Sequence, residues 1–208
     1  MRLYFSPGAC SLASRIVLEE VGTAYEAEQV DIRAKTCATG DFTTVNPRGQ
    51  VPALRMENGE VLTEGAVIMQ YIADLRGDGK ILPKFGTAER TRVLEAVNFI
   101  ATDIHKTYGA LFAAERMVTD VAARESYKGN VRAQLVRYFD HIERQLAGRE
   151  FVAGKEFTIA DAYLFTCWNW NQHVGIDASA WKNLNTWATR VYTRPAVQKA
   201  MKAEGLLK

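Results

Sequence analysis

The stretch at residues 2–22, RLYFSPGACSLASRIVLEEVG, decides the expected fold, because a short strand gives way to a helix around one cysteine. The apolar run at 2–5 predicts a strand, and the apolar spacing from residue 11 onward predicts a helix that ends at Gly22. Cys10 lies at the turn between the two. Three positions later, where a C-x-x-C redox motif carries its second thiol, the chain has Ala13. The sequence therefore places a cysteine without a local partner at the start of a helix.

Strands and helices alternate through the first eighty residues. The expected elements after the first helix are a strand at 24–32, a short turn-rich helical segment at 38–49, a hairpin at 51–63 and a helix at 64–77. The hairpin follows from Asn58-Gly59, a strong signal for a tight turn between two half-apolar runs. This order predicts an α/β unit with a small sheet, which we place at residues 1–80.

The second half of the chain shows helical periodicity and no convincing strand. Residues 77–86, GDGKILPKFG, carry three glycines and a proline and are read as a linker. Helical patterns then cover residues 87–117, 121–148 and 157–175. Thr158 and Asp161 form a capping box at the start of the last of these. We therefore expect an all-helical domain at 87–208.

Composition excludes several classes of partner. The net charge is only +2 and lysines and arginines do not cluster, which argues against nucleic acid or an anionic membrane. No apolar run reaches the roughly 18 residues of a membrane span, and the first residues lack the apolar core of a signal peptide. The cysteines at 10, 37 and 167 have neither disulfide-framework nor metal-site spacing. We therefore expect a cytoplasmic protein without a metal.

Cys10 is the strongest candidate for chemistry. A helix N-terminus lowers the pKa of a cysteine and so favours the thiolate, which is the nucleophilic form. The alternative is a small buried apolar side chain, which is the reading we give to Cys167 in its apolar helix. Because of its place at a strand-to-helix turn, we expect Cys10 to be functional.

Three further sites suit a peptide-like anionic ligand. Val51 precedes Pro52, and an extended residue at an exposed edge offers its N–H and C=O to a bound peptide. Glu64-Gly65 starts a helix, where free N–H groups attract an anion and the carboxylate accepts from an amine. Lys35 is a cation in a loop. Each has an ordinary alternative: a proline at the first position of a strand, an acidic first helical turn, and a solvated charge.

Taken together, these segments resemble the glutathione transferases, and among them the bacterial beta class, which has a cysteine at its active site. The resemblance spans the chain. It rests on YFSPGACSLASRIVLEE (4–20), NPRGQVPAL (46–54), VLTEGAVIMQYIAD (61–74), NFIATDIHKTYGALF (98–112) and FTIADAYLF (157–165). It implies a thioredoxin-like N-terminal domain, an all-helical C-terminal domain, a homodimer and bound glutathione as co-substrate.

The resemblance also implies roles for individual residues. Cys10 faces the glutathione sulfur with Ser11 beside it, and Val51 pairs with the cysteinyl backbone ahead of a cis-proline, Pro52. The other expected contacts are Glu64 and Gly65 at the γ-glutamyl end and Lys35 at the glycyl carboxylate. The family usually has serine at the position of Gly65, so a hydroxyl contact is lost here while the backbone N–H remains.

The long helix adds a second set of residues by the same resemblance. The glutathione contacts expected from it are Asn98, Thr102, Asp103 and His105, and the acceptor pocket is expected at Tyr108, Phe112 and Trp168. His105 has an ordinary pKa of about 6.5, so it suits proton transfer or stabilisation of a thiolate. On an ideal helix His105 lies ~160° from Asp103, so we expect Asp103, and by resemblance Asn98, to serve the site of the partner subunit.

The resemblance implies an enzyme that conjugates glutathione to hydrophobic electrophiles, with thiol–disulfide exchange through Cys10 as a second activity. Two alternatives stay open at this point. One is a specialised relative, either a reductive dehalogenase or an ether-cleaving enzyme, because the acceptor pocket is the least readable part of the sequence. The other is a non-catalytic ligand-binding protein, since the same fold serves as a carrier.

Overall fold

A computed structural model of the chain describes residues 1–207. Its first part is a six-stranded sheet in the order β4-β3-β2-β1-β5-β6. The strands are β1 (Arg2–Phe5), β2 (Glu26–Asp31), β3 (Thr36–Cys37), β4 (Gly40–Asp41), β5 (Ala53–Arg55) and β6 (Val61–Leu62). Only β1 and β2 run parallel, with Leu3 opposite Ala27. Leu3 also lies opposite Leu54 of the antiparallel strand β5.

Alternation along the strands gives the sheet two different faces. Leu3, Phe5 and Leu54 point to one face and join the main core. That face is covered by α1 (Ser11–Val21) and α2 (Gly65–Arg76). Tyr4 points to the other face, in a small cluster with Val30, Phe42 and Ala53. The expected strand-helix order is therefore present, and the Asn58-Gly59 turn joins β5 to β6 with Gly59 at φ 87°.

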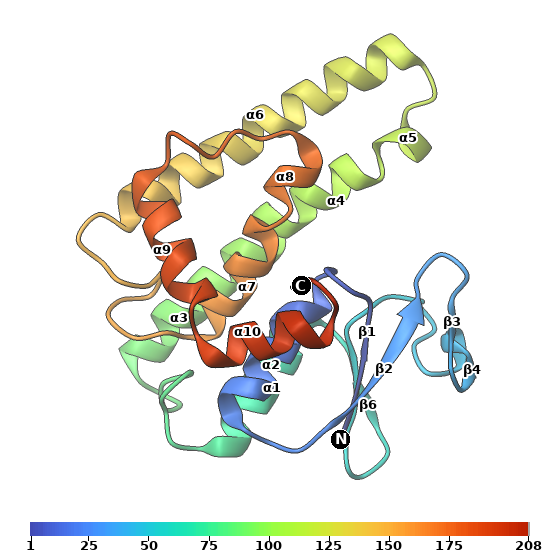
Figure 1. Cartoon of the computed structure of the whole chain (residues 1–208), viewed down its shortest axis with the longest axis vertical. Coiled ribbons are helices and arrows are strands. Elements are labelled where there is room, and N and C mark those ends of the chain that lie inside the picture. Colours follow the sequence, from blue (N-terminus) through green and yellow to red (C-terminus); the bar gives the residue numbers. More distant parts are fainter. Residues whose placement is uncertain (208) are drawn as a thin grey trace.

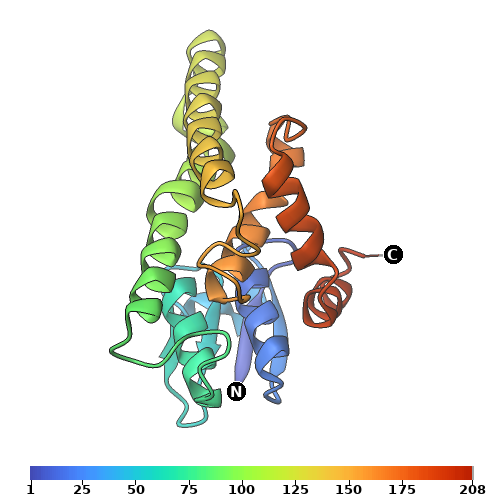
Figure 2. The ribbon, with the colours of Figure 1, turned by 90° about the vertical axis from the view of Figure 1, so that its left-hand side faces the viewer.

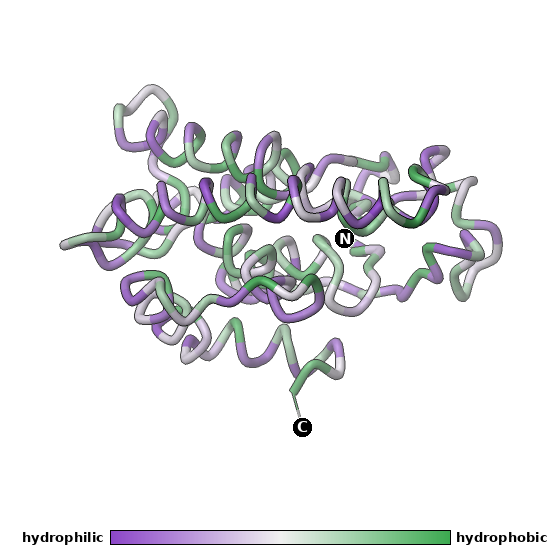
Figure 3. Tube along the Cα trace, turned by 90° about the horizontal axis from the view of Figure 1, so that it is seen from above, coloured by the Kyte–Doolittle hydropathy of each residue, from purple (hydrophilic) through white to green (hydrophobic). Residues whose placement is uncertain are grey.

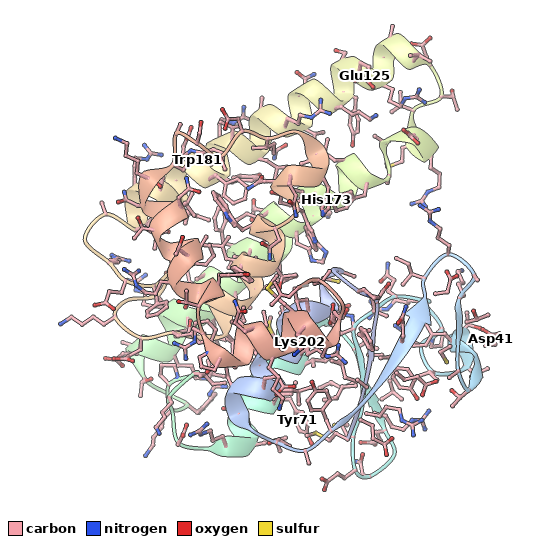
Figure 4. All side chains as sticks on the ribbon, in the orientation of Figure 1. Asp41, Tyr71, Glu125, His173, Trp181 and Lys202 are labelled. Atoms are coloured by element: carbon pink, nitrogen blue, oxygen red, sulfur yellow. The ribbon has the colours of Figure 1, made fainter. Side chains whose placement is uncertain are left out.

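The segment at 38–49 is less helical than the sequence predicts. It contributes β4, which pairs with β3 in a small hairpin, and then a single 3₁₀ turn at Phe42–Thr44. Asp41 explains the turn, because its carboxylate accepts hydrogen bonds from the N–H and the hydroxyl of Thr43, both at 2.8 Å. Figure 4 shows Asp41 in this hairpin, far from the helical part of the molecule.

Beyond residue 86 the regular elements are helices. They are α3 (Ala88–Phe99), a π-helical turn (Ile100–His105), α4 (Lys106–Phe112), α5 (Ala114–Met117), α6 (Val121–Gln145), α7 (Ile159–Trp168), α8 (Asn171–Val174), α9 (Lys182–Tyr192) and α10 (Pro195–Ala203). Figure 1 shows them stacked beside the sheet, and Figure 2 shows the yellow helix, α6, extending beyond the rest. Within the described residues, no helix is long and apolar enough to cross a membrane.

The helical part packs against the sheet part in addition to being connected to it by residues 77–86. Residues 77–86 have no regular structure, yet Ile81 and Leu82 are buried, and the carbonyl of Ile81 accepts from the N–H of Ile159. In addition, α10 packs along α1, so the end of the chain returns to the sheet part (Figure 1). Figure 3 shows polar and apolar residues alternating along the helices, as expected where one face of a helix is buried.

The capping box that the sequence indicates is present. The Thr158 hydroxyl accepts from the N–H of Ala160, and the Asp161 carboxylate accepts from the N–H of Thr158. Nearly all of α7 behind this cap is buried, and Cys167 within it is fully buried. The cap therefore fixes the start of the central helix of the domain.

Candidate functional site

A cleft of about 460 Å³ lies between the sheet part and the helical part. Its wall includes Cys10, Arg48, Val51, Glu64, His105 and Tyr163. The first four come from the sheet part and the last two from the helical part, so residues distant in sequence meet here. Of the residues expected at a glutathione site, Cys10, Val51, Pro52, Glu64, Gly65 and His105 line this cleft.

Cys10 occupies the N-cap of α1, at the turn where the sequence places it. Its thiol donates a hydrogen bond to the carbonyl oxygen of Val51 at 3.1 Å. Burial raises the pKa of the Cys10 thiol to about 12, and the backbone N–H groups of Cys10 and Ser11 oppose that rise only in part. The low pKa expected from the helix N-terminus is therefore absent, because burial outweighs the helix end and the thiol has a carbonyl acceptor.

Ser11 lies beside Cys10, but its side chain faces inward. The residue is fully buried, and its hydroxyl pairs with the backbone of Ser6, accepting from the N–H at 3.1 Å and donating to the carbonyl at 3.2 Å. The hydroxyl therefore holds the turn before the helix and does not reach the cleft. A contact from Ser11 to a ligand would involve its backbone N–H.

The Val51–Pro52 peptide bond is cis, and both residues line the cleft. The carbonyl of Val51 accepts from Cys10, while its N–H makes no hydrogen bond within residues 1–207. The preceding loop is held by Asn46, whose side-chain amide donates to the carbonyl of Gln50 at 2.7 Å. A backbone donor is thus left free at a fixed position, which suits pairing with an extended peptide.

Glu64 precedes α2 in a strained conformation. Its φ is 67°, in a region that non-glycine residues rarely occupy, and such strain is concentrated at functional sites. Its carboxylate forms an ion pair with Arg48 at 2.7 Å, and Arg48 also donates to the Thr63 hydroxyl at 2.9 Å. The N–H groups of Gly65 and Ala66 at the helix start have no partner among the described residues. This corner offers an acceptor, a cation and free donors to a zwitterionic group.

Gly65 lacks a side chain where the chain comes close to the cis-proline. A Cβ at Gly65 would lie 3.4 Å from the ring of Pro52, and the φ of Gly65 is not positive. A side chain at this position therefore requires only a small adjustment. The glycine is not needed for backbone conformation.

Lys35 lies at the rim of the cleft. It has a positive φ of 56°, its side chain is exposed, and it forms no ion pair within residues 1–207. The aliphatic part of the side chain packs over Gly49, where an added Cβ would lie 3.1 Å from Lys35 Cδ. Gly49 itself lines the cleft. The ammonium group of Lys35 is therefore available near the cleft without being part of its wall.

His105 ends the π-helical turn and lines the same cleft as Cys10. Its Nδ1 lies 2.7 Å from the hydroxyl of Tyr163 on α7. Burial lowers the pKa of His105, and the negative charge of Glu64 opposes this only in part. The imidazole is consequently neutral near pH 7, so His105 contributes a hydrogen bond rather than a positive charge.

The other residues expected from the long helix lie outside the cleft wall. Asn98 and Thr102 are exposed, and the Thr102 hydroxyl donates to the carbonyl of Asn98 at 3.0 Å or pairs with the carboxylate of Asp103 at 2.8 Å. Within one chain, the structure therefore brings His105 to the site and leaves these three residues on a surface outside it. This separation matches the opposite faces that the helical spacing predicts for Asp103 and His105.

The structure places two of the three expected acceptor-pocket residues in an aromatic core. Tyr108 is fully buried and donates to Asn171 Oδ1 at 2.6 Å. Trp168 packs between Phe139 and Trp181, where Figure 4 shows Trp181 between α6 and α9. Neither lines the cleft. The physical reason is that an aromatic stripe at helical spacing packs against the neighbouring helices.

Phe112 is more than half exposed at the end of α4 and stacks on Tyr108. Trp170, which the sequence analysis did not single out, lies between Phe112 and His105. Its indole N–H donates to the carbonyl of Gly8 in the turn before Cys10, at 2.8 Å. Trp170 thus connects the helical part to the turn that carries the cysteine.

Arg48 and Tyr163 are the other residues that the sequence analysis missed. Both lie in motifs that carry the family resemblance, Arg48 in NPRGQVPAL and Tyr163 in FTIADAYLF. No motif spacing links them to Cys10, so their place in the cleft follows only from the fold. As for metals, no cluster of three or more candidate ligands is present among residues 1–207.

Comparison with known proteins agrees with this geometry. Residues 8–75 match the family model "Glutathione S-transferase, N-terminal domain", and residues 73–195 match "Glutathione S-transferase, C-terminal domain". The chain is 40% identical to glutathione S-transferase GstA of Escherichia coli O157:H7, over 99% of this chain and 100% of that protein.

Solved structures match along the same length. A sphingomonad glutathione S-transferase complexed with glutathione is 39% identical and has a TM-score of 0.91, with both chains covered completely. The bacterial beta class glutathione S-transferase of Sphingomonas chungbukensis is 41% identical, with the same TM-score and coverage.

Proposed function

Because the chain belongs to the glutathione S-transferase family, we propose that its cleft binds glutathione and presents the glutathione thiol to hydrophobic electrophiles. The observation that carries this proposal is the meeting of Cys10, the cis Val51–Pro52 bond, the start of α2 and His105 around one cleft. A cytoplasmic location is part of the proposal, and it suits the three free cysteines.

The unpaired groups of the cleft match the parts of a tripeptide with two charged ends. The free N–H of Val51 suits the central residue, since it is an unpaired backbone donor in the cleft wall. The N–H groups that start α2, with Glu64 and Arg48, suit the amine and carboxylate of the γ-glutamyl end. Lys35 supplies a cation for the glycyl carboxylate at the rim.

The protonation states favour the ligand thiol as the nucleophile. The Cys10 thiol stays protonated near pH 7 because its pKa is about 12, so the protein cysteine is a weak nucleophile at that pH. In conjugation, the glutathione sulfur forms a bond to the electrophilic carbon and the leaving group departs with the bonding electrons. A donor from His105 favours the thiolate that this step requires.

Binding of glutathione measured by calorimetry tests the proposal. We expect binding at millimolar or lower concentration, and Glu64→Gln weakens it roughly 10- to 100-fold because it removes a charge-assisted contact. Glu60→Gln is the matched control, because Glu60 lies in the β5–β6 hairpin, pairs with Asn58 and does not line the cleft. If the wild-type protein shows no heat of binding at millimolar glutathione, the proposed function is wrong.

A second candidate activity is thiol–disulfide exchange at Cys10. The supporting observation is that Cys10 is a free thiol in the cleft wall, whereas Cys167 is fully buried. The Cys10 thiolate would attack a glutathione disulfide, form a mixed disulfide and release one glutathione thiolate. Mass spectrometry after exposure to oxidised glutathione should find the adduct at Cys10, formed faster at higher pH. An adduct at Cys37 with Cys10 unmodified contradicts this activity.

We also propose a homodimer in which Asp103 serves the site of the partner. The supporting observation is that Asp103 shares a turn with His105 and yet lies outside the cleft of its own chain. A heterodimer of one Cys10→Ala subunit and one Asp103→Asn subunit separates the possibilities. If Asp103 acts across the interface, one site is doubly altered and the other intact, so about half of the disulfide exchange returns. Activity no higher than in the mutant homodimers assigns Asp103 to its own subunit.

A further inference from the structure

The imidazole of His105 is fixed by contacts on two sides. Its Nδ1 lies 2.7 Å from the hydroxyl of Tyr163, which comes from α7. The indole of Trp170, just before α8, lies against the ring with centroids 5.2 Å apart. Because one nitrogen is engaged and the ring is packed, only Nε2 remains to interact with a ligand.

The direction of the Tyr163–His105 hydrogen bond follows from counting donors and acceptors. Burial lowers the pKa of His105 and raises the pKa of the Tyr163 phenol far above its ordinary value, so the imidazole is neutral and the phenol keeps its hydrogen. If Nδ1 carried the imidazole hydrogen, the phenolic O–H would have no acceptor within residues 1–207, since Nδ1 is its sole hydrogen-bond partner there. The satisfied arrangement has the Tyr163 O–H donating to Nδ1, which leaves the imidazole hydrogen on Nε2.

The free nitrogen of His105 is open to the cleft. Nε2 makes no hydrogen bond within residues 1–207. It is also not fully buried. It is therefore accessible, and His105 lines the same cleft as Cys10. A donor N–H at this position is offered to a ligand in the cleft that Cys10 also lines.

We propose that Tyr163 is a positioning residue that holds His105 in the tautomer with its hydrogen on Nε2, so that His105 presents a constant hydrogen-bond donor to the cleft. This inference rests on the proposed function in one respect, because the acceptor of that donor is the thiolate of bound glutathione. His105 then acts as a hydrogen-bond donor to the thiolate and not as a base that removes its proton.

The other ionisable groups around His105 agree with this role. Cys10, which lines the same cleft, is a neutral thiol, and Tyr163 is a neutral phenol. Glu64 is the carboxylate that raises the pKa of His105, and its charge is compensated by Arg48 at 2.7 Å. None of these groups overcomes the burial that keeps the imidazole neutral.

The direct test is the ring ¹⁵N NMR spectrum of His105 in the ligand-free protein, assigned by its loss in His105→Gln. The chain has three histidines, and the other two, His141 and His173, lie elsewhere; Figure 4 shows His173 on α8. We expect the neutral Nε2–H tautomer from pH 6 to 8 in the wild type. Tyr163→Phe should mix the two tautomers and raise the pKa of His105 by about half a unit to one unit, because a bond to the neutral form is lost.

Tyr108→Phe is the matched control, since Tyr108 is a buried tyrosine with a hydroxyl bond of 2.6 Å that does not line the cleft. It should leave the His105 signals unchanged. A wild-type spectrum with the hydrogen on Nδ1 overturns the proposal, even if Tyr163→Phe does not fold. An unchanged tautomer and pKa in folded Tyr163→Phe also overturn it.

The second readout is the ultraviolet titration of the thiol of bound glutathione. Tyr163→Phe should raise the pKa of that thiol by about half a unit to one unit, and lower kcat by about three- to tenfold below that pKa without changing the KM for glutathione. A changed KM with an unchanged thiol pKa contradicts the positioning role. If glutathione does not bind at all, the proposed function fails while the ligand-free NMR result still decides the tautomer.

Discussion

Replacement of Asp161 should lower the free energy of unfolding more than replacement of any other acidic side chain at a helix start. The carboxylate is fully buried and accepts four hydrogen bonds. Oδ1 accepts from the N–H of Val152 and from the indole N–H of Trp187, both at 2.9 Å. Oδ2 accepts from the N–H of Thr158 at 2.9 Å and from its hydroxyl at 3.1 Å. One side chain thus joins the start of α7 to the preceding loop and to α9.

The magnitude follows from the donors left behind. Asp161→Ala removes the acceptor of three N–H groups that cannot turn away, and each buried, unsatisfied donor costs about 1–3 kcal/mol. The loss in the free energy of unfolding should therefore be at least about 3 kcal/mol, a large share of the roughly 5–15 kcal/mol of a typical domain. Trp187→Phe removes one donor and leaves the carboxylate three others, so it should cost less.

Urea unfolding followed by circular dichroism measures these losses from the midpoint at constant slope. Asp177→Ala is the control, because Asp177 also accepts from a backbone N–H and a hydroxyl, those of Ser179, but in an exposed turn. It should cost less than about 1 kcal/mol. If the two aspartate variants lose the same free energy, the buried donors do not set the cost and the reasoning is refuted.

Three other perturbations give distinct outcomes. Burial raises the pKa of Glu204 to about 7 from an ordinary 4.5. The contribution of Glu204 to the free energy of unfolding is therefore complete below about pH 4.5 and is lost as the pH rises through 7. Glu204→Gln should reduce the fall in the free energy of unfolding between pH 5 and 8, measured by urea unfolding. Alkylation of Cys10 by iodoacetamide, followed by mass spectrometry, should accelerate up to at least pH 9, and a plateau below pH 8 contradicts the raised pKa of its thiol. Gly65→Ser should change the free energy of unfolding by less than about 1 kcal/mol in the same assay, because the added Cβ meets only the Pro52 ring, at 3.4 Å. A larger loss means that the close approach of residue 65 to Pro52 requires glycine.

Local signals in the sequence were sufficient for much of the fold. Asn58-Gly59 marks the β5–β6 hairpin because a tight turn needs a residue with positive φ, and Gly59 has it. Thr158 and Asp161 mark the start of α7 because a capping box involves only residues three apart. The β3–β4 hairpin was missed, since strands of two residues are too short for an alternating pattern.

Contacts distant in sequence account for what was not predicted. Tyr163 meets His105 across 58 positions, and no spacing rule connects them. Trp170 is not predicted and Trp168 is assigned to the pocket because α7 ends at Trp168, so the helical spacing does not continue to the residue that packs on His105. The high pKa of Cys10 is not predicted for a related reason. The sequence shows locally that Cys10 starts a helix, but the burial that raises the pKa of its thiol depends on the tertiary fold.

The two sides of the cleft differ in the kind of group that they contribute. The sheet side offers backbone donors, which are the free N–H of Val51 and the N–H groups at the start of α2, together with the side chains of Cys10, Arg48 and Glu64. The helical side offers the side chains of His105 and Tyr163 on elements that pack together. A substitution preserves a backbone N–H but replaces a side chain, so the part of binding that rests on backbone donors tolerates substitution, whereas the part that rests on Glu64 and Arg48 does not. The proposed hydrogen bond to the glutathione sulfur depends on the helical domain, because His105 is held there by Tyr163 of α7.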